Sequence, residues 1–491
     1  MGLRRGIFAA GVALALLSGG AVRADEPVAV TQHQMRGGGQ TLAYSAEVGR
    51  LPIADVATGE PHGFMGYIAY RIPSKDGAPR PLTFVWNGGP GANSTTLHFE
   101  VVGPYRGEGT ALVANAETWL AFTDLVFVDP IGTGFSRPAK AEYAEEFYGT
   151  VGDVASVTEF VRAWRIAHKA EAAPTYLAGE SWGAGRAASV AHELLKRGAP
   201  VEGLILISGG SGLRDVGPPR ALATALRAAD WAQAALAHGK LAPDLPKDPE
   251  ALRLAAEAWA RETYAPALER IDALSAAERE AVADGLSRFI GLPAGEIDRA
   301  TLTVSPRQYR EGLLKAEGKT LYVFDVRRTD SGDGDFDPAI LRYIRHDLNY
   351  PSPLPYVGLE PWEAGYAPGG AYPQSVGARW NYATAPVTED EVKAAIAKAI
   401  KDGGGPPQLG PPLPGTAEAV ALDPSLRVLV AAGWHDSLNS CAANREVEAR
   451  LTGAVAQAVS FRCYAGGHMF YRDPPSRLAF SRDVRAMIEG R

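Results

Sequence analysis

Cysteine is scarce in this chain, with only Cys441 and Cys463 among its 491 residues. Two cysteines are too few for the disulfide framework of a small secreted scaffold, so that class of protein is excluded. In an oxidising compartment the two can form one bridge, and a bridge and two free thiols both remain open from the sequence. The chain is long enough for one large domain with insertions or for two domains.

A large excess of one charge is also missing. Asp and Glu number 56 against 49 Lys and Arg, and the two signs are mixed along the chain without a basic stripe. We therefore expect no nucleic-acid partner. Beyond the first residues, no apolar run is long enough for a membrane helix, so we expect no membrane partner either. The sequence does not indicate an oligomeric state.

Cofactor motifs are absent as well, since zinc-ligand, phosphate-loop and dinucleotide patterns do not occur. One acidic cluster has partial calcium-loop spacing, and it consists of Asp330, Asp333, Asp335 and Asp337. Pro338 stands where such a loop needs glycine, and Ile344 stands where it needs the closing glutamate. We therefore expect a solvated loop here, and neither a metal nor a cofactor.

The first 24 residues have the layout of a secretory signal. Arg4 and Arg5 supply the positive charge, and the apolar run from Ile7 to Leu17 is too short to span a bilayer. Small residues at Val22 and Ala24 fit a signal-peptidase site. We expect cleavage before Asp25 and a mature protein that is secreted or periplasmic. An uncleaved N-terminal anchor is the alternative.

Apolar runs alternate with helical patterns through the first half of the mature chain. Residues 40–73 alternate apolar and polar positions, as antiparallel strands do. Later apolar runs, each typical of a strand covered on both faces, are 82–86, 125–128, 176–178 and 201–208. Helical segments at 154–167 and 186–195 separate the later runs. This pattern predicts an α/β fold with a mostly parallel sheet and helices on both faces.

The pattern changes after Gly210 and returns near the C-terminus. Residues 218–345 are rich in Ala, Leu, Arg and Glu at helical spacing, and a Pro/Gly-rich stretch follows. Strands are expected again at 426–432 and 458–464, before a closing helix at 476–488. We divide the chain into a signal (1–24), a first core part (25–214), a mainly helical lid insertion with its linker (215–424) and a second core part (425–491).

The segment Gly179-Glu180-Ser181-Trp182-Gly183 joins an expected strand to an expected helix. A serine between two glycines at such a turn is typical of a nucleophile elbow, in which the hydroxyl is exposed on a strained bend. A solvated serine in an ordinary turn is the alternative. The motif alone is too common in a glycine-rich chain to decide between them.

A serine nucleophile needs a base and an acid that orients the base, and in this fold they follow the serine in the order acid, then histidine. Asp436 follows the strand at 426–432, and His468 follows the strand at 458–464. Both lie at the same sheet edge as Ser181, so we predict these three residues as the catalytic triad. His435 lies on the loop of the acid and Asp423 precedes its strand, so neither is preferred.

Several motifs spread over the predicted sheet domain occur together. They are Asn87-Gly88-Gly89-Pro90-Gly91, Phe99-Glu100 with Gly103-Pro104, Asn115 with Trp119, the run Asp129 to Ser136, Gly179-Glu180-Ser181 and Gly467-His468-Met469. In this combination the chain resembles the serine carboxypeptidase family, acid-active exopeptidases of the α/β-hydrolase fold. Prolyl aminopeptidases share the Gly-Gly-Pro-Gly loop but lack a glutamate directly before the serine.

The resemblance implies further site residues. The backbone N–H groups of Gly89 and Trp182 would form the oxyanion hole. The substrate's terminal carboxylate would be bound by Asn87, Glu100 and Glu180. Two neighbouring carboxyl groups cannot both ionise cheaply, so one would stay protonated and donate to that carboxylate, and activity would be favoured in acid.

The chain also departs from the family. Val85 holds the place of the usual tryptophan, with Trp86 adjacent, and the spacing from Asn87 to Glu100 is one residue shorter. Ala92 stands where a cysteine is common, so the usual disulfides are absent. A bridge between Cys441 and Cys463 would instead tie the loop of the acid to the strand before the base.

We therefore expect an exported serine carboxypeptidase acting on peptides with a free C-terminus through an acyl-enzyme on Ser181. An esterase or acyltransferase with the same triad is one alternative. A non-catalytic binding protein on this scaffold is the other. Side-chain preference is not readable from the sequence, because the expected insertion would build that pocket.

Overall fold

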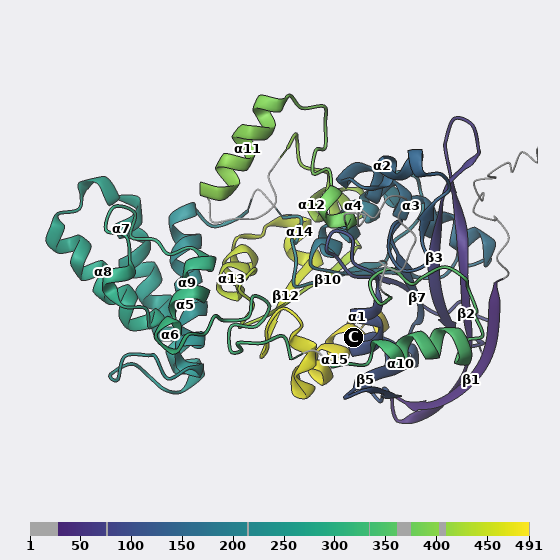
Figure 1. Cartoon of the computed structure of the whole chain (residues 1–491), viewed down its shortest axis with the longest axis horizontal. Helices are drawn as coiled ribbons and strands as arrows, with labels where there is room; N and C mark the ends of the chain where they lie inside the picture. The colour runs from purple at the N-terminus through teal and green to yellow at the C-terminus, as the bar shows by residue number, and fades with distance from the viewer. Residues whose placement is uncertain are drawn as a thin grey trace, which may run out of the picture.

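The computed structural model describes residues 28–74, 77–213, 216–332, 334–360, 375–401 and 409–490. The expected signal segment and parts of the Pro/Gly-rich stretch lie outside these residues. Within them, no helix combines the length and apolar character that crossing a bilayer requires. Figure 1 shows a sheet flanked by helices, with a separate group of helices, α5 to α9, beside it.

A ten-stranded sheet forms the centre of the described chain, in the order β1-β2-β3-β7-β4-β9-β10-β11-β12, with β8 pairing with β3. Its strands are β1 (Ala29–Gly37), β2 (Gln40–Ala54), β3 (Pro61–Arg71), β4 (Leu82–Trp86), β7 (Asp124–Asp129), β8 (Arg137–Pro138), β9 (Thr175–Glu180), β10 (Gly203–Ile207), β11 (Arg427–Gly433) and β12 (Val459–Tyr464). The first three strands and β7 pair antiparallel, and β7, β4 and β9 to β12 run parallel. A short hairpin, β5 (Tyr105–Glu108) and β6 (Ala111–Ala114), lies apart.

Helices cover both faces of this sheet because its strands are apolar on both sides. The helices of this part are α1 (Thr95–Leu97), α2 (Ala144–Phe147), α3 (Thr150–Ala167), α4 (Trp182–Lys196), α12 (Thr416–Leu422), α13 (Cys441–Arg450), α14 (Gly453–Ala458) and α15 (Pro474–Glu489). Residues of α3, α4 and α12 share one hydrophobic core with the sheet, as Trp164, Leu194 and Val420 illustrate. On the opposite face, η1 (His98–Val102) and α15 contribute Phe99 and Phe480.

The segment between β10 and β11 is mainly helical. Besides α12 and several short 3-10 helices, it contains α5 (Arg220–Ala237), α6 (Pro249–Trp259), η4 (Ala260–Tyr264), α7 (Ala265–Glu269), α8 (Ala276–Ile290), α9 (Pro306–Gly312), α10 (Asp337–Arg342), η8 (Tyr343–Asp347) and α11 (Glu389–Lys401). Helices α5 to α9 bury their own apolar cluster, which includes Leu226, Leu252 and Leu286. In contrast, α10 packs on the sheet part through Ile340.

Candidate active site

Ser181 occupies a strained turn between β9 and α4. Its backbone has φ 57° and ψ −125°, a conformation that a side-chain-bearing residue rarely adopts. The flanking glycines are required by close packing. A Cβ on Gly179 would lie 1.9 Å from the Gly183 carbonyl oxygen, and one on Gly183 would lie 2.7 Å from the Asn87 carbonyl oxygen. The turn therefore has the geometry of a nucleophile elbow.

Asp436 and His468 lie in the loops after β11 and β12 and contact each other. His468 Nδ1 and Asp436 Oδ2 are 2.7 Å apart, and both side chains are almost fully buried. Asp436 also accepts from the Leu438 amide (2.8 Å) and from Asn439 Nδ2 (2.7 Å). A carboxylate so placed keeps the proton on Nδ1, which leaves Nε2 as the atom able to accept a proton.

The other nitrogen of the His468 ring, Nε2, is buried and has no hydrogen-bond partner among the described residues. Ser181 and His468 line the same cavity. Burial alone lowers the pKa of His468, but the Asp436 carboxylate and, less strongly, Glu180 raise it above the usual value. Serine, histidine and aspartate thus gather at one edge of the sheet, with the ring nitrogen available to a reacting group.

A short segment of the insertion, residues 323–326, contacts both of these loops. The Phe324 carbonyl accepts from the His468 amide at 2.5 Å, and the two rings lie 5.1 Å apart. The Val323 carbonyl accepts from Ser437 Oγ at 2.5 Å, and the Val326 amide donates to the His435 carbonyl at 3.0 Å. The insertion therefore fixes the backbone on which Asp436 and His468 stand.

Two backbone N–H groups approach the elbow from different elements. Trp182 is the first residue of α4, where helix geometry leaves the amide without an intrahelical partner. Gly89 has φ 102°, and the neighbouring Gly88 packs so tightly that its Cβ would lie 2.5 Å from the Trp182 nitrogen. These are the groups expected to form the oxyanion hole, and they lie beside Ser181 in the cavity wall.

Glu180 is buried directly before the serine. Its carboxyl oxygens accept short hydrogen bonds from Asn87 Nδ2 and from the Tyr471 hydroxyl. Burial raises the pKa of Glu180, while His468 and Tyr471 lower it and the nearby Glu100 raises it further, so that the net shift is upward. The carboxyl group therefore stays neutral to a higher pH than an exposed glutamate.

Glu100 lies in the same region but has a different partner. Arg472 holds it in a bidentate ion pair, with nitrogen–oxygen distances of 2.6 and 2.7 Å. The expected pairing of two carboxyl groups around one proton is thus modified, because an arginine neutralises the second carboxylate. Arg472 follows His468 by four residues, and its charge places a cation at the edge of the predicted carboxylate site.

A buried ion pair between α3 and α4 supports the loop that carries Asn87. Arg186 on α4 contacts Asp153 on α3 at 2.6 Å and donates to the Asn87 carbonyl at 2.8 Å. The adjacent Trp86 donates its indole N–H to the Gly183 carbonyl at 2.9 Å and is fully buried. Trp86 therefore supports the elbow, and its indole N–H is already used within the protein.

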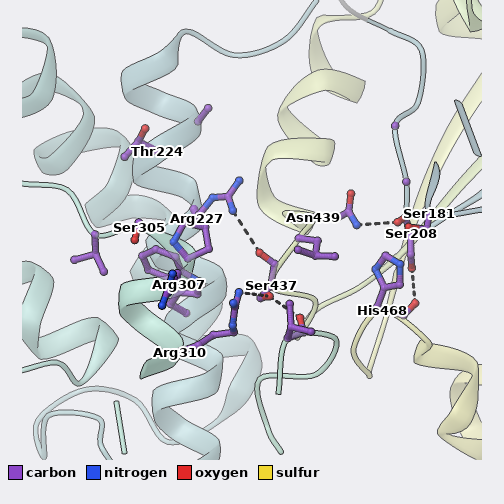
Figure 2. A pocket seen from close by; sticks show the side chains of 18 of the residues that line it. Ser181, Ser208, Thr224, Arg227, Ser305, Arg307, Arg310, Ser437, Asn439 and His468 are labelled. Atoms are coloured by element: carbon purple, nitrogen blue, oxygen red, sulfur yellow. Dashed lines mark hydrogen bonds between the residues drawn. The ribbon is translucent and has the colours of Figure 1, made fainter. Parts of the chain in front are cut away.

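The cavity in front of Ser181 has a volume of about 890 Å³. One wall comes from the sheet part, and the other comes from α5, α9 and their neighbours in the insertion. Figure 2 shows the side chains of both walls facing one another. The Trp182 ring meets Trp380 and Tyr382 edge to face, and Trp182 and Tyr382 both line the cavity.

The remaining residues considered from the sequence lie outside the reacting centre. Cys441 and Cys463 are joined in a disulfide. His435 is half-buried, and loss of solvent around the ring, with the nearby Arg327, lowers its pKa to about 4. Asp423 accepts from the Ser425 amide at the entrance to β11. In the acidic cluster, Asp330 pairs with Arg328, and Asp333 lies outside the described residues.

Some residues of the site were not anticipated from the sequence. Tyr471 and Arg472 follow the His468 loop in η10 (Phe470–Arg472) and contact Glu180 and Glu100. Asn439 bridges Asp436 to the carbonyl of Ser208. Only the closeness of Tyr471 and Arg472 to His468 in the chain could have suggested them.

Together the sheet order, the elbow and the strand-end Asp and His define an α/β-hydrolase. Residues 67–202 match the family model described as serine carboxypeptidase. This segment contains Asn87, Glu100, Glu180 and Ser181 but ends before Asp436. The resemblance to serine carboxypeptidases seen in the motifs is therefore confirmed for the segment that carries the nucleophile.

Curated relatives agree with this match over short stretches. A pheromone-processing carboxypeptidase KEX1 from Verticillium alfalfae is 33% identical over 130 residues, which are 26% of this chain and 20% of that protein. Serine carboxypeptidase-like 36 from Arabidopsis thaliana is 36% identical over 84 residues, 16% of this chain and 17% of that protein. The matched parts thus span about a fifth of each relative.

Among solved structures, the crystal structure of Kex1(Δ)p, a prohormone-processing carboxypeptidase from Saccharomyces cerevisiae, matches with a TM-score of 0.50. The alignment covers 91% of both chains at 16% identity. At this identity the likeness establishes the fold, which is the α/β-hydrolase fold that the sequence predicts.

Proposed function

We propose that the protein is a serine carboxypeptidase that removes C-terminal residues from peptides. The observation that carries the proposal is Glu180, a buried carboxyl group next to the nucleophile, with Asn87 and Tyr471 as partners and a raised pKa. A neutral carboxyl group beside an amide, with Arg472 balancing the charge of Glu100, can receive a substrate carboxylate without repulsion. A general esterase has no need of such a group.

In the proposed mechanism, Ser181 Oγ attacks the last peptide carbonyl while His468 Nε2 takes its proton. Asp436 holds the Nδ1–H and stabilises the charged ring. The N–H groups of Gly89 and Trp182 stabilise the oxyanion of the tetrahedral intermediate. His468 then gives the proton to the departing amino group, and water hydrolyses the acyl-enzyme by the same route.

The test compares peptides with a free C-terminus and the same peptides amidated, across about pH 4 to 7, where the terminal carboxyl groups are largely ionised. The free peptides should be trimmed one residue at a time, and the Ser181→Ala variant should be inactive. Equal rates on both series would favour an esterase or acyltransferase. Failure of a fluorophosphonate to label Ser181 in the folded protein would instead favour a non-catalytic binding protein.

We also propose that the chain is exported and loses residues 1–24. The charged and apolar layout of these residues supports this, and so does the Cys441–Cys463 disulfide, because such bonds persist in oxidising compartments. N-terminal sequencing of protein from the culture medium or periplasm should begin at Asp25. Recovery of an intact Met1 in a membrane fraction would show an uncleaved anchor.

A further inference from the structure

The far wall of the active-site cavity is rich in arginine. Helix α5 contributes Arg220 and Arg227, two turns apart on one face, and α9 contributes Arg307 and Arg310, one turn apart. Among the described residues that line the cavity, no Asp or Glu occurs. The cavity therefore has a strongly positive wall in a protein whose formal net charge is −7.

Two of these arginines, Arg227 and Arg310, converge on one residue of the opposite wall. Arg227 Nη1 donates to the Ser437 carbonyl and Arg310 Nη1 to Ser437 Oγ, each at 3.4 Å (Figure 2). Both side chains are half-buried, and within the described part of the chain neither pairs with a carboxylate. A guanidinium has five N–H donors, so two long contacts leave most of them available to a ligand.

The charged form of Arg310 is disfavoured at this wall of the cavity. Burial lowers the pKa of Arg310, and Arg307 lowers it further, although Glu311 acts in the opposite direction. Arg220 and Arg307 are exposed, and Arg307 pairs with Glu311 at 2.7 Å. Arg227 and Arg310 are therefore the inner cations. An anionic group between them would offset the cost of burying the Arg310 charge and match the forked geometry of the guanidinium.

The position of the arginines decides which part of a peptide they meet. In Figure 2, Ser437 and Asn439 lie between the arginine side chains and the reacting pair, Ser181 and His468. Asn87 and Glu180, the proposed receptors of the terminal carboxylate, do not line this cavity. An anion at Arg227 and Arg310 would therefore belong to the acyl part of the substrate.

We propose that this cavity selects peptides carrying Asp or Glu on the N-terminal side of the scissile bond, with Arg227 and Arg310 binding the side-chain carboxylate. This specificity rests on the proposed carboxypeptidase activity. The arginines are specificity residues, because they contact the substrate away from the reacting carbonyl. Their charge also favours capture of acidic peptides over neutral ones through the local field.

The experiment uses the full-length protein and N-blocked peptides that differ only by Glu or Gln at each of the last positions before the scissile bond. At about pH 6 the Glu side chain is ionised, and kcat/KM for the best-placed Glu peptide should exceed that of its Gln partner by about 10- to 100-fold. The preference should fall at high salt and as the pH drops through the substrate's own carboxyl pKa.

The Arg227→Gln/Arg310→Gln variant should reduce the Glu/Gln ratio to about one, while kcat/KM on the Gln peptide stays within about 3-fold. Arg288→Gln is the matched control, since Arg288 is an exposed arginine of α8 paired with Asp244 and outside the cavity lining. Equal losses on both peptides in the double variant would show that the arginines only maintain the cavity, and would overturn the proposal.

Binding to the Ser181→Ala variant separates this inference from the proposed function. Suppose that the wild-type protein hydrolyses no peptide, but the Ser181→Ala variant binds the Glu peptide more tightly than the Gln peptide. The anion site then stands and the carboxypeptidase proposal fails. If wild type trims Glu and Gln peptides equally at every position, the carboxypeptidase proposal stands and the anion site is wrong. If amidating the C-terminus of the Glu peptide is by itself enough to abolish binding, the arginines bind the terminal carboxylate, and this outcome also contradicts the inference.

Discussion

Glu180 and His468 place opposite demands on pH within one site. The proposed mechanism needs a neutral His468 ring to take the proton and a neutral Glu180 to receive the substrate carboxylate. The pKa of both groups is raised. Raising the pKa of His468 moves the acidic limit of activity upward, and raising the pKa of Glu180 extends the alkaline limit upward. Activity should therefore follow a bell-shaped profile bounded by these two groups.

The variant Glu180→Gln tests this assignment. Gln cannot ionise, so the alkaline limb that Glu180 causes should disappear from the profile of kcat/KM. The measurement is kcat/KM on a peptide with a free C-terminus across the pH range.

Tyr471→Phe is a useful companion, since it removes one partner of Glu180 but leaves the carboxyl group itself. Its profile should keep an alkaline limb, moved to higher pH, because the Tyr471 hydrogen bond lowers the pKa of Glu180. A Glu180→Gln profile identical to wild type would refute the role given to Glu180.

Among single residues, the sequence predicts those whose role depends on a local pattern. Ser181, Asp436 and His468 each follow a recognisable strand, and the structure brings the acid and base to 2.7 Å. Tyr471, Arg472 and the cavity arginines could not be predicted. Their positions depend on how η10, α5 and α9 pack against distant segments, which no periodicity of the sequence encodes.

Helix α5 connects the insertion to the start of α13, which follows the loop that carries Asp436. On its inner side Asp230 is buried against the start of α13, where it accepts from the Ala442 amide at 3.4 Å and leaves Oδ2 without a partner among the described residues. Burial raises the pKa of Asp230 to about 7, although the Ser440 and Ala442 contacts oppose the shift. Folding therefore favours the neutral form of this carboxyl group.

The sign of the stability change follows from linkage. The folded pKa exceeds the ordinary value of about 3.9, so the contribution of Asp230 is fully present below about pH 4 and is lost as pH rises toward 7. Asp230→Asn should therefore leave stability unchanged at low pH and raise the unfolding free energy by roughly 1 to 4 kcal/mol above pH 7. Urea denaturation at the two pH values measures this.

Asp272 is exposed and provides the control. The Asp272→Asn variant should change the unfolding free energy by no more than about 0.5 kcal/mol at either pH. Destabilisation by Asp230→Asn at high pH would mean that the charged carboxylate is needed at the start of α13.

Elements differ in how well the sequence predicts them. The sequence predicts the six parallel strands within a few residues, because each is a short apolar run next to a glycine-rich loop, but it does not predict β1 or β8. In the insertion, capping boxes at Ser275 and Ser305 mark the starts of α8 and α9. The way these helices face the active site could not be predicted, since it depends on contacts such as Tyr309 with Trp231 on α5.

On the scale of the whole molecule, the sheet is assembled from two distant parts of the chain. Strands up to β10 precede the insertion, and β11 and β12 follow it, so the triad combines both parts. The disulfide lies wholly in the second part and joins the start of α13 to β12 across 22 residues, with Cα atoms 6.0 Å apart. It restrains the loop that carries Asp436 relative to the strand that leads to His468.

The variant Cys441→Ala/Cys463→Ala removes this restraint. Closing a loop of this length contributes roughly 2 to 4 kcal/mol in the chain-entropy view, so the unfolding free energy should fall by about that amount. Denaturation with and without a reducing agent gives the check. Reduction should weaken wild type and leave the variant unaffected, whereas a wild type indifferent to reduction would contradict a stabilising bridge.

The contacts of residues 323–326 with the loops of Asp436 and His468 limit how such a protein can be re-engineered or diversify. An insertion that only shaped the substrate pocket could be exchanged between relatives to transfer specificity. Here the His468 amide and Ser437 hydroxyl would lose their acceptors, Phe324 and Val323, in any exchange that omitted this segment. A working chimaera must therefore place its junctions so that residues 323–326 stay with the sheet part.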